Sequence, residues 1–327
     1  MAEVRTADTA RTTAPERPAK AERPGPASQS EAAKPPAKRT LKDYRSEVKP
    51  TWCPGCGDFG VLAALQRALA ERNLDPRDVV IVSGIGCSGR LPEFVNAYGL
   101  HVVHGRALPA AQGVKAANPD LTVIAVGGDG DGFAIGGGHV PHAVRRNQDI
   151  TYIVMDNQVY GLTKGQPSPS TPTGMQALRR SVSMPKMAPY EGVLEGQLNI
   201  LAMVIVYGCS FVARTFSSQA TEMAKTIGRG LDHPGFAFVH AMSPCPTFYN
   251  TYDPWKESFM PLPDDWDTGD RIKAIDMAME EVGDGVFHSG VFFQDVYRTY
   301  TDKLQDVYAK AYGEEQATID ALMDQYA

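Results

Sequence analysis

The stretch Val126-Gly-Gly-Asp-Gly-Asp-Gly-Phe-Ala-Ile-Gly-Gly-Gly138 follows directly on an apolar run, residues 121–126. Glycines at the end of a strand let the backbone approach a phosphate closely, and a following helix offers free amide groups to the anion. The carboxylates of Asp129 and Asp131 would repel that phosphate unless a cation lay between them, and Mg²⁺ prefers such oxygen ligands. The stretch therefore predicts the end of a strand in an α/β sheet, with a site for a phosphorylated ligand and a divalent ion.

A second source of oxygen ligands ends the next apolar run, in Met155-Asp-Asn-Gln-Val-Tyr-Gly-Leu-Thr-Lys-Gly165. Successive strands of a parallel sheet end at the same edge, so Asp129 and Asn157 are expected to meet there. The structural alternative is a pair of Asx-rich turns that bind nothing, as in many α/β proteins. We favour the ligand site because both halves are present and one strand separates them.

Elsewhere the chain alternates short apolar runs with helical patterns. Runs typical of strands occupy residues 79–82, 101–104, 121–126, 150–155 and 236–240, and helical patterns occupy residues 61–69, 107–117, 139–146 and 219–231. The apolar run at 198–213 is too short to span a membrane comfortably, so it is interpreted as a buried helix that leads into a buried strand. This alternation predicts an α/β fold: a mostly parallel sheet with helices on both faces.

The two ends of the chain differ from the middle in composition. Residues 1–40 are almost wholly Ala, Pro, Ser, Thr and charged residues, which predicts a disordered tail. The α/β domain is expected over residues 41–252. Residues 253–327 are polar and aromatic with a helical pattern at 300–312, and are expected to pack as an extension on the domain or on a partner subunit.

Charge and cysteine content exclude several classes of protein. A net charge of −6 gives no reason to expect a nucleic-acid partner, and the sequence predicts no membrane association. The N-terminal stretch lacks the apolar segment of a secretory signal, which predicts the cytoplasm. Five cysteines, an odd number in a reducing compartment, favour metal binding or catalysis over disulfides.

Four of the cysteines lie in loops expected at one edge of the sheet: the Cys53-Pro-Gly-Cys56 loop, Cys87 and Cys245. A Cys-x₂-Cys pair alone is compatible with zinc, with an iron–sulfur cluster or with a redox dithiol. Structural zinc usually takes its other ligands from a second close-spaced pair, and the sequence has none. The scattered thiols therefore favour a buried cluster.

The combination of Gly128-Asp-Gly130 with Asp156-Asn157 resembles the motif of thiamine diphosphate enzymes, which begins Gly-Asp-Gly and usually ends Asn-Asn. The resemblance implies that Mg²⁺ is bound by Asp129, Asn157 and the backbone carbonyl of Val159. Asp156 stands where the family usually has its first Asn, a position that is not a metal ligand.

The same chain also carries Trp52-Cys-Pro-Gly-Cys-Gly57, Gly86-Cys-Ser88, His104-Gly-Arg-Ala107 and Ser243-Pro-Cys245. With these motifs, residues 41–252 resemble the β subunit of 2-oxoacid:ferredoxin oxidoreductases. The resemblance implies a [4Fe–4S] cluster held by Cys53, Cys56, Cys87 and Cys245. It also implies that thiamine diphosphate is bound by Ser88, His104, Gly105, Gly128, Gly130, Asp131, Gly161 and Thr163. Cys209 matches no ligand position and is interpreted as a small core residue.

The resemblance further implies an activity and its partners. The reaction would be CoA-dependent oxidative decarboxylation of a 2-oxoacid, with 2-oxoglutarate expected over pyruvate, or its reverse, and single electrons would pass through the cluster to ferredoxin. In this family the glutamate that activates the cofactor belongs to a separate α subunit. An αβ or (αβ)₂ assembly is therefore expected, and the isolated chain is expected to be inactive.

Two charged residues are interpreted as catalytic, each with an alternative. Arg90 is predicted to grip the distal carboxylate of 2-oxoglutarate, but a surface arginine paired with Glu93 has equal weight. Lys164 is predicted to help with substrate or phosphate charge, and a solvated lysine is the alternative. His104 has a structural alternative too, as a cap for the helix at Ala107.

Two rival functions come from other classes of protein. One is a non-redox thiamine diphosphate decarboxylase or synthase subunit with structural zinc bound by the cysteines. The other is a non-catalytic metal-binding subunit in which the glycine loops are only turns.

Overall fold

A computed structural model describes residues 38–175, 192–284 and 286–312. The chain divides into two units, Met1–Lys38 and Arg39–Ala327, and the second contains all the elements named below. The predicted disordered tail lies outside the described residues as far as residue 37.

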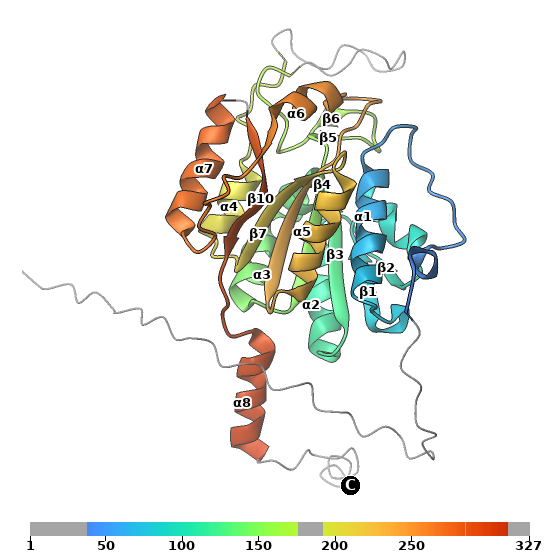
Figure 1. Cartoon of the computed structure of the whole chain (residues 1–327), viewed down its shortest axis with the longest axis vertical. Helices are drawn as coiled ribbons and strands as arrows, with labels where there is room; N and C mark the ends of the chain where they lie inside the picture. The colour runs from blue at the N-terminus through green and yellow to red at the C-terminus, as the bar shows by residue number, and fades with distance from the viewer. Residues whose placement is uncertain (1–37, 176–191, 285, 313–327) are drawn as a thin grey trace, which may run out of the picture. The chain divides into compact units, whose positions relative to one another are not determined.

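The second unit is built on an eight-stranded sheet in the order β2-β1-β3-β4-β8-β7-β10-β9 (Figure 1). The strands are β1 Val79–Ser83, β2 Tyr98–His101, β3 Thr122–Gly128, β4 Ile150–Asp156, β7 Phe211–Phe216, β8 Phe236–Met242, β9 Phe259–Pro261 and β10 Phe287–Gln294. Every pairing from β2 to β7 is parallel, and β10 pairs antiparallel with β7. The predicted mostly parallel sheet is confirmed.

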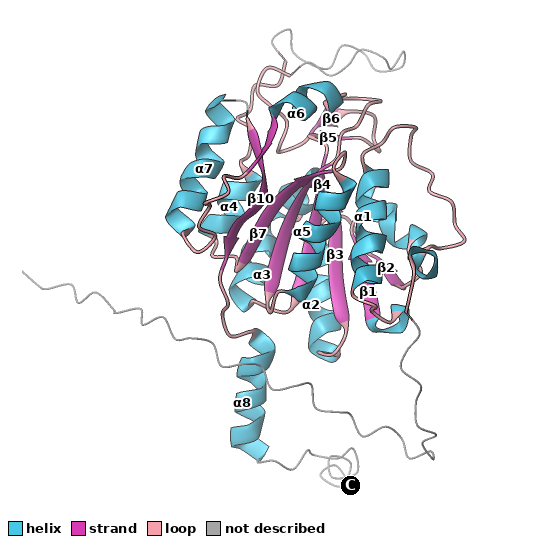
Figure 2. Ribbon diagram, viewed as in Figure 1, coloured by secondary structure: helices cyan, strands magenta, loops and turns pink. Residues whose placement is uncertain are grey.

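Helices cover both faces of the sheet, as predicted (Figure 2). Helices α1 (Asp58–Glu71) and α5 (Ala220–Asp232) pack on one face. The other face is covered by α2 (Ala107–Ala117), α3 (Val140–Arg146), α4 (Ile200–Val206) and α7 (Arg271–Asp284). The remaining elements are the helices α6 (Tyr252–Ser258) and α8 (Tyr300–Tyr312), the small hairpin β5 (Val159–Tyr160) with β6 (Gln166–Pro167), and the short helical turns η1 (Leu41–Tyr44), η2 (Pro76–Asp78), η3 (Ser88–Phe94), η4 (Asp131–Ile135) and η5 (Gly137–His139).

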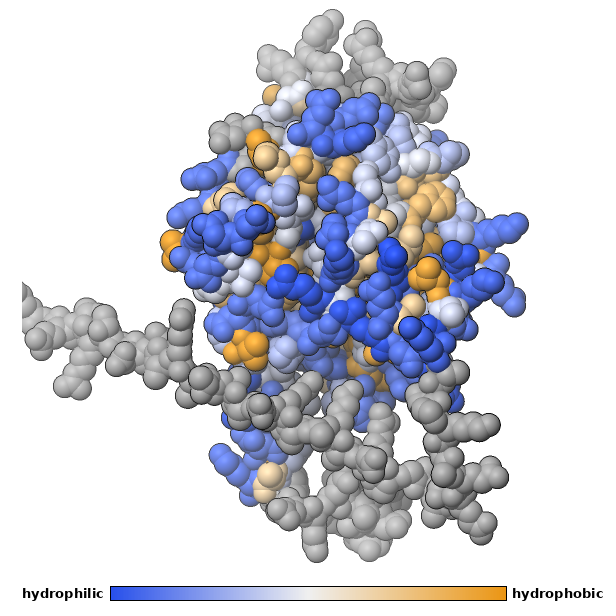
Figure 3. Space-filling view, viewed as in Figure 1, coloured by the Kyte–Doolittle hydropathy of each residue, from blue (hydrophilic) through white to orange (hydrophobic). Residues whose placement is uncertain are grey.

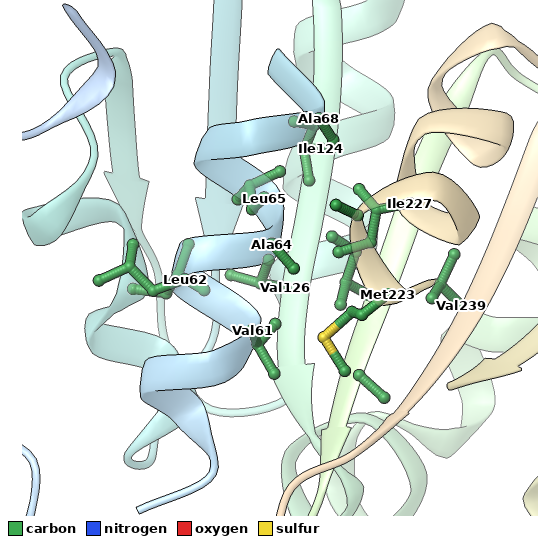
Figure 4. Packing of buried hydrophobic residues seen from close by; sticks show 14 of the residues in the cluster. Val61, Leu62, Ala64, Leu65, Ala68, Ile124, Val126, Met223, Ile227 and Val239 are labelled. Atoms are coloured by element: carbon green, nitrogen blue, oxygen red, sulfur yellow. The ribbon is translucent and has the colours of Figure 1, made fainter. Parts of the chain in front are cut away.

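The two hydrophobic layers follow from the alternation of side chains along the buried strands. In β3, Ile124 and Val126 belong to the layer under α1 and α5, whereas Val123 and Ala125 belong to the opposite layer. Figure 4 shows Ile124 and Val126 among the side chains of α1 and α5. Burying a large apolar side chain such as Leu65 stabilises the fold by about 1.5–3 kcal/mol, so these layers hold the strand ends in place.

The apolar run at 198–213 forms α4 and the start of β7, which confirms the predicted helix followed by a strand. Asn199 begins the helix, because its side-chain oxygen accepts the N–H of Ala202 at 3.0 Å. Gly208, with a φ of 92°, lets the chain turn sharply into the strand.

The run at 101–104 differs from its prediction, because β2 ends at His101. The N–H of Gly105 donates to the carboxylate of Asp131 at 2.7 Å, and His104 contacts the same carboxylate. These bonds hold residues 102–106 in a turn, and the turn leads into α2.

Residues after 252 extend the sheet, whereas the sequence predicted only a packed extension. Strand β10 continues the sheet beyond β7, β9 pairs with β10, and α7 packs beside α4. The segment from α6 to β10 is therefore part of the α/β fold.

In the described part of the chain, no helix combines the length and apolar character needed to cross a membrane. Figure 3 shows hydrophilic residues over most of the face in view, interrupted by small apolar areas.

Candidate functional site

The parallel strands end at one edge of the sheet, here called the carboxyl edge. Strands β3 and β4 stay paired as far as Gly128 and Met155, so Asp129 and Asn157 leave the sheet close to the same point. The loops after β1 and β8 reach the same edge, since Ser83 pairs with Val126 and Met242 pairs with Asp156. The fold thus gathers the predicted metal ligands and the loops of Cys87 and Cys245 on one side of the sheet.

Asp129 is buried and surrounded by polar groups. Its Oδ2 accepts hydrogen bonds from the hydroxyls of Ser168 and Ser170, the second at 2.6 Å. Burial, together with the nearby carboxylate of Asp156, raises the pKa of Asp129 well above its usual range, against the effect of the two serines. A buried carboxyl group held beside a second carboxylate favours a cation, so these surroundings fit Mg²⁺.

Asn157 and Val159 lie on either side of a left-handed residue, Gln158, whose φ is 61°. The N–H of Val159 donates to Asn157 Oδ1 at 3.0 Å, which forms a tight Asx turn. The turn brings the Asn157 amide and the Val159 backbone together, directly after Asp156, which shares the Ser170 hydroxyl with Asp129. One carboxylate, one amide oxygen and one carbonyl form a donor set that Mg²⁺ prefers.

The serine-rich segment that follows supports this loop, and sequence reasoning missed it. Ser170 Oγ lies 2.6 Å from Asp129 Oδ2 and 2.9 Å from Asp156 Oδ1, and Thr171 donates to the Gln158 carbonyl at 2.6 Å. In the sequence these serine and threonine residues are typical of any surface loop. Only their position against the carboxylates reveals their role.

Asp156 is matched by a histidine from the neighbouring strand. His240 Nε2 lies 2.8 Å from Asp156 Oδ2, and both side chains are buried. On the other side of the imidazole, Arg214 Nε approaches His240 Nδ1 at 3.4 Å. These three side chains line a cavity of about 220 Å³ together with apolar residues such as Ile200.

Asp131 was expected to contact the cofactor, and the structure uses its carboxylate to join loops. Its Oδ1 accepts the N–H groups of Ile85 at 2.9 Å and Gly105 at 2.7 Å, and lies 2.7 Å from His104 Nδ1. Its Oδ2 is buried and has no hydrogen-bond partner among the described residues. A side chain on Gly84 would collide with this carboxylate, which explains the glycine there.

Two of the predicted cofactor-binding glycines, Gly105 and Gly130, stand where side chains would not fit. Gly105 has a φ of 72°, and a methyl group on it would come within 2.6 Å of the Gly136 nitrogen. A side chain on Gly130 would strike the ring of Tyr160, a residue that the sequence analysis did not single out. Tyr160 also packs edge-on against His104, with the ring centroids 6.4 Å apart. An aromatic residue directly after the predicted metal-binding turn was the signal that could have identified it.

Ser88 and Gly128 meet at the start of the glycine-rich loop. Ser88 is buried, and a methyl group on Gly128 would lie 3.3 Å from its hydroxyl oxygen. This places the predicted serine at the predicted phosphate-binding loop.

Thr163 and Lys164 lie in the turn between β5 and β6. The Thr163 hydroxyl donates to Gln166 Oε1 at 2.6 Å, and the turn closes through the Gly165 N–H, which donates to the Tyr160 carbonyl at 2.8 Å. Lys164 is exposed and has a left-handed φ of 84°. This environment is that of the solvated lysine given as the alternative.

The predicted metal loop and two of the cysteines meet at Gly161. A methyl group on Gly161 would lie 3.6 Å from each of three atoms: Asn157 Nδ2, Cys87 Sγ and Cys245 Sγ. The three atoms are therefore within about 7 Å of one another. Sequence reasoning placed them on one side of the sheet, and the structure brings them into one site.

Cys53 and Cys56 approach the same site. Burial raises the pKa of the Cys56 thiol, and so do the charges of Asp58, Cys87 and Cys245. Burial likewise raises the pKa of the Cys87 thiol to about 12, with contributions from Asp58, Cys245 and Cys53. Each of the four thiols thus lies within electrostatic reach of another. In the part of the chain that the structure describes, no three Cys, His, Asp or Glu side chains are close enough to hold a single metal ion.

Hydrogen bonds connect the cysteine loops. The N–H of Gly57 donates to the Pro244 carbonyl at 3.0 Å, and the Trp52 indole donates to the Cys87 carbonyl at 2.8 Å. Cys56 and Cys87 are partly buried and Cys245 is buried. These features and the links between the loops fit a thiolate-bound cluster held between three loops. Cys209 lies apart in the core, and its thiol donates to the Phe211 carbonyl at 3.2 Å.

Arg90 is held by a neighbour on the same turn. Its Nη2 donates to Glu93 Oε2 at 2.7 Å and its Nε to Glu93 Oε1 at 3.3 Å, while Nη1 donates to the Thr51 hydroxyl. The arginine side chain is 38% exposed. The structure therefore shows the paired arginine that the sequence analysis gave as the alternative.

Two family models match the chain. The model described as "Thiamine pyrophosphate enzyme, C-terminal TPP binding domain" matches residues 84–241, and a model of the C-terminal part of the pyruvate ferredoxin oxidoreductase beta chain matches residues 245–309. The β subunit of 2-oxoacid:ferredoxin oxidoreductase 1 from Aeropyrum pernix is 43% identical over 235 residues, which is 71% of each chain. The chain belongs to the 2-oxoacid:ferredoxin oxidoreductase β subunits.

Other members of this family are similar to our β subunit. The 2-oxoglutarate synthase subunit KorB of Methanocaldococcus jannaschii is 40% identical over 214 residues, 65% of this chain and 76% of KorB. A solved 2-oxoglutarate:ferredoxin oxidoreductase from Magnetococcus marinus, with 2-oxoglutarate, coenzyme A and succinyl-CoA bound, superposes with a TM-score of 0.80 at 40% identity. That match covers 89% of the β subunit and 97% of the solved chain. The predicted family and its thiamine diphosphate-binding fold are confirmed.

Proposed function

We propose that this β subunit holds the cofactor and the electron-transfer centre of an enzyme that decarboxylates 2-oxoglutarate oxidatively. 2-Oxoglutarate and CoA would give succinyl-CoA, CO₂ and a proton, and the electron pair would leave as single electrons on ferredoxin. The same enzyme would run the reaction in reverse when reduced ferredoxin is supplied. The proposal is supported by membership of the family and by the name of the solved relative, which contains 2-oxoglutarate, coenzyme A and succinyl-CoA.

The convergence at Gly161 is the observation that carries the proposal. When bound, thiamine diphosphate supplies the sink for the electrons that decarboxylation leaves behind, and the cluster supplies a one-electron acceptor. Electrons pass efficiently only between centres that lie close together. The Asn157 amide and the sulfurs of Cys87 and Cys245 surround one glycine, so the metal loop and the cysteine site are adjacent.

The residues of the metal loop have separate tasks in this proposal. Asp129, Asn157 and the Val159 carbonyl would hold Mg²⁺, which neutralises the diphosphate beside them. Ser168 and Ser170 both donate to Asp129 Oδ2, which orients the carboxylate before the ion binds.

The tightly packed glycines would let the diphosphate approach the backbone of the loop after β3, beside Ser88. Asp131 would hold the loops of Ile85 and His104 against this phosphate-binding loop through its three hydrogen bonds.

Arg90 and Lys164 are the proposed contacts to substrate charge. A bidentate guanidinium matches a carboxylate, and Glu93 already occupies the fork of Arg90 in that manner. Substrate would therefore have to displace Glu93, and the distal carboxylate of 2-oxoglutarate has the chemistry to do so. Lys164 is exposed, where it could attract the anionic substrate.

The remaining partners belong to the proposal as well. An α subunit would supply the activating glutamate in an αβ or (αβ)₂ assembly, and the relatives' description as β subunits supports it. Ferredoxin would accept the electrons close to the cysteine site. The five free cysteines of the structure support a reducing, cytoplasmic location.

The test is anaerobic purification of the αβ complex, followed by assays for iron, sulfide and zinc and an absorption spectrum near about 400 nm, where Fe–S thiolate bands are expected. A brown protein with equal amounts of iron and sulfide, which reduces ferredoxin with 2-oxoglutarate and CoA, would support the proposal. A colourless protein that contains zinc would be compatible with the proposed thiamine diphosphate site but would contradict the proposed redox function. Failure to bind thiamine diphosphate with Mg²⁺ would point to a non-catalytic subunit.

A further inference from the structure

A buried carboxyl group lies directly beside the cysteine site and has no role in the function described above. Asp58 is the first residue of α1, two positions after Cys56, and its side chain is only 1% exposed. Ser243, two positions before Cys245, donates its hydroxyl to Asp58 Oδ1 at 2.5 Å. One carboxyl group therefore joins two of the loops that carry cysteines.

The contact between these loops is tight. A methyl group on Gly57 would come within 2.7 Å of the Ser243 hydroxyl and of the Pro244 nitrogen. The backbone N–H of Ser243 also donates to the Asp156 carbonyl at 2.7 Å, at the end of β4. Ser243 thus links Asp58 to the strand that carries the metal loop.

The charge of Asp58 reaches most of the cysteines. It raises the pKa values of Cys56, Cys87 and Cys245 in addition to the effect of their burial. Its position favours the anionic form, because the N-terminus of a helix as long as α1 attracts negative charge.

Oδ2 of Asp58 is buried and has no hydrogen-bond partner among the described residues. A buried carboxylate with an unpaired oxygen destabilises a fold, so its presence here calls for a functional reason.

We propose that Asp58 is a positioning residue of the [4Fe–4S] site, which holds the Cys56 and Cys245 loops together and lowers the reduction potential of the cluster with a fixed negative charge. The inference rests on the proposed cluster. Reduction adds one electron to the cluster, taken from the 2-oxoacid and later passed to ferredoxin. A negative charge nearby in a poorly solvated site opposes that added charge, so the potential becomes more negative.

The direct test replaces Asp58 by Asn in the αβ holoenzyme, which keeps the shape and removes the charge. The potential of the cluster is measured by redox titration followed by electron paramagnetic resonance. Asp58→Asn is expected to raise the ratio of reduced to oxidised cluster about tenfold at a given potential, a shift of about 59 mV for one electron. An unchanged or more negative potential would overturn the proposal.

The matched control is Glu71→Gln, which removes one negative charge from the last residue of the same helix. With a rise of about 1.5 Å per residue, Glu71 lies about 20 Å from Asp58, beyond the screening length of salt. Its cluster potential is expected to equal that of the wild type. An equal shift in both variants would show an effect of net charge alone and would refute the local role.

A second variant keeps the proposal testable if Asp58→Asn loses its iron. Ser243→Ala removes the hydroxyl that links Asp58 to the Cys245 loop, so a chelator is expected to remove iron several-fold faster than from the wild type. An unchanged rate of iron loss in Ser243→Ala would overturn the proposal. The two hypotheses fail differently, because a wild-type protein without iron contradicts the proposed function, whereas an iron-loaded protein with an unmoved potential contradicts only the role of Asp58.

Discussion

His104 Nδ1 lies 2.7 Å from Asp131 Oδ1, and the same oxygen accepts the N–H groups of Ile85 and Gly105. A carboxylate can only accept hydrogen bonds, so Nδ1 of His104 carries the hydrogen and Nε2 is left to face other partners. One oxygen atom therefore sets the orientation of the imidazole and connects the loops after β1, before α2 and after β3.

We expect Asp131→Ala to weaken thiamine diphosphate binding about tenfold and to lower the free energy of unfolding by about 2–4 kcal/mol, since hydrogen bonds to a charged acceptor contribute about 1.5–3 kcal/mol each. Titration of the holoenzyme with cofactor and urea unfolding would measure the two effects. Asp78→Ala is the control, an exposed aspartate before β1. Unchanged cofactor binding in Asp131→Ala would show that the three loops keep their arrangement without the Asp131 carboxylate.

The pair formed by Arg90 and Glu93 predicts opposite effects of two substitutions. Arg90→Ile is expected to reduce kcat/KM for 2-oxoglutarate far more than for pyruvate, which has no distal carboxylate. Glu93→Gln removes the competing carboxylate, so KM for 2-oxoglutarate is expected to fall by several-fold while KM for pyruvate stays the same. Steady-state kinetics with both substrates would decide, and equal losses for both in Arg90→Ile would contradict the role.

Ser170 is expected to tune the affinity for Mg²⁺ through Asp129. Ser170→Ala removes a donor 2.6 Å from Asp129 Oδ2, and loss of such a supporting bond typically weakens metal binding by about 10–100-fold. Thr173→Ala is a matched control in the same loop, because the Thr173 hydroxyl donates to the Glu195 carbonyl. Mg²⁺ titration in the presence of thiamine diphosphate would compare the variants, and equal affinities would exclude the supporting role.

The cysteines differ in a way that metal analysis can measure. Cys87→Ala is expected to abolish the iron content of the αβ complex, because its thiol lies at the meeting point beside Gly161. Cys209→Ala removes a thiol buried elsewhere in the core and is expected to leave iron and sulfide unchanged. Loss of iron in both variants would indicate that the assay reports folding and not ligation.

His233 predicts a loss of stability in acid. Burial lowers the pKa of His233 to about 4, whereas the unfolded chain binds the proton near the usual value of about 6.5. The unfolded state thus holds more protons between these values, and the free energy of unfolding falls as the pH decreases from about 6.5 to 4, by up to about 3 kcal/mol.

His233→Gln, which has no titrating ring, is expected to remove this part of the pH dependence. Urea unfolding at several pH values would compare it with the wild type, and identical slopes would assign the acid sensitivity to other groups.

The sequence alone determined the architecture and the side of the sheet that carries the site. Apolar runs separated by helical patterns require a parallel sheet, because each crossover returns the chain to the same end. The residues that follow the strands, such as Asp129, Asn157, Cys87 and Cys245, must then gather at the carboxyl edge. Short-range patterns were sufficient for this, since the position of a residue after a strand is a local property.

The tertiary structure decided which of these side chains meet. Asp58 and Ser243 are 185 positions apart, and no local pattern relates them. The addition of β9 and β10 to the sheet, the serines on Asp129 and the contact of Asp131 with Ile85 likewise depend on packing between distant segments. Such contacts follow from how the helices and strands fit together in three dimensions, and the order of the residues does not reveal them.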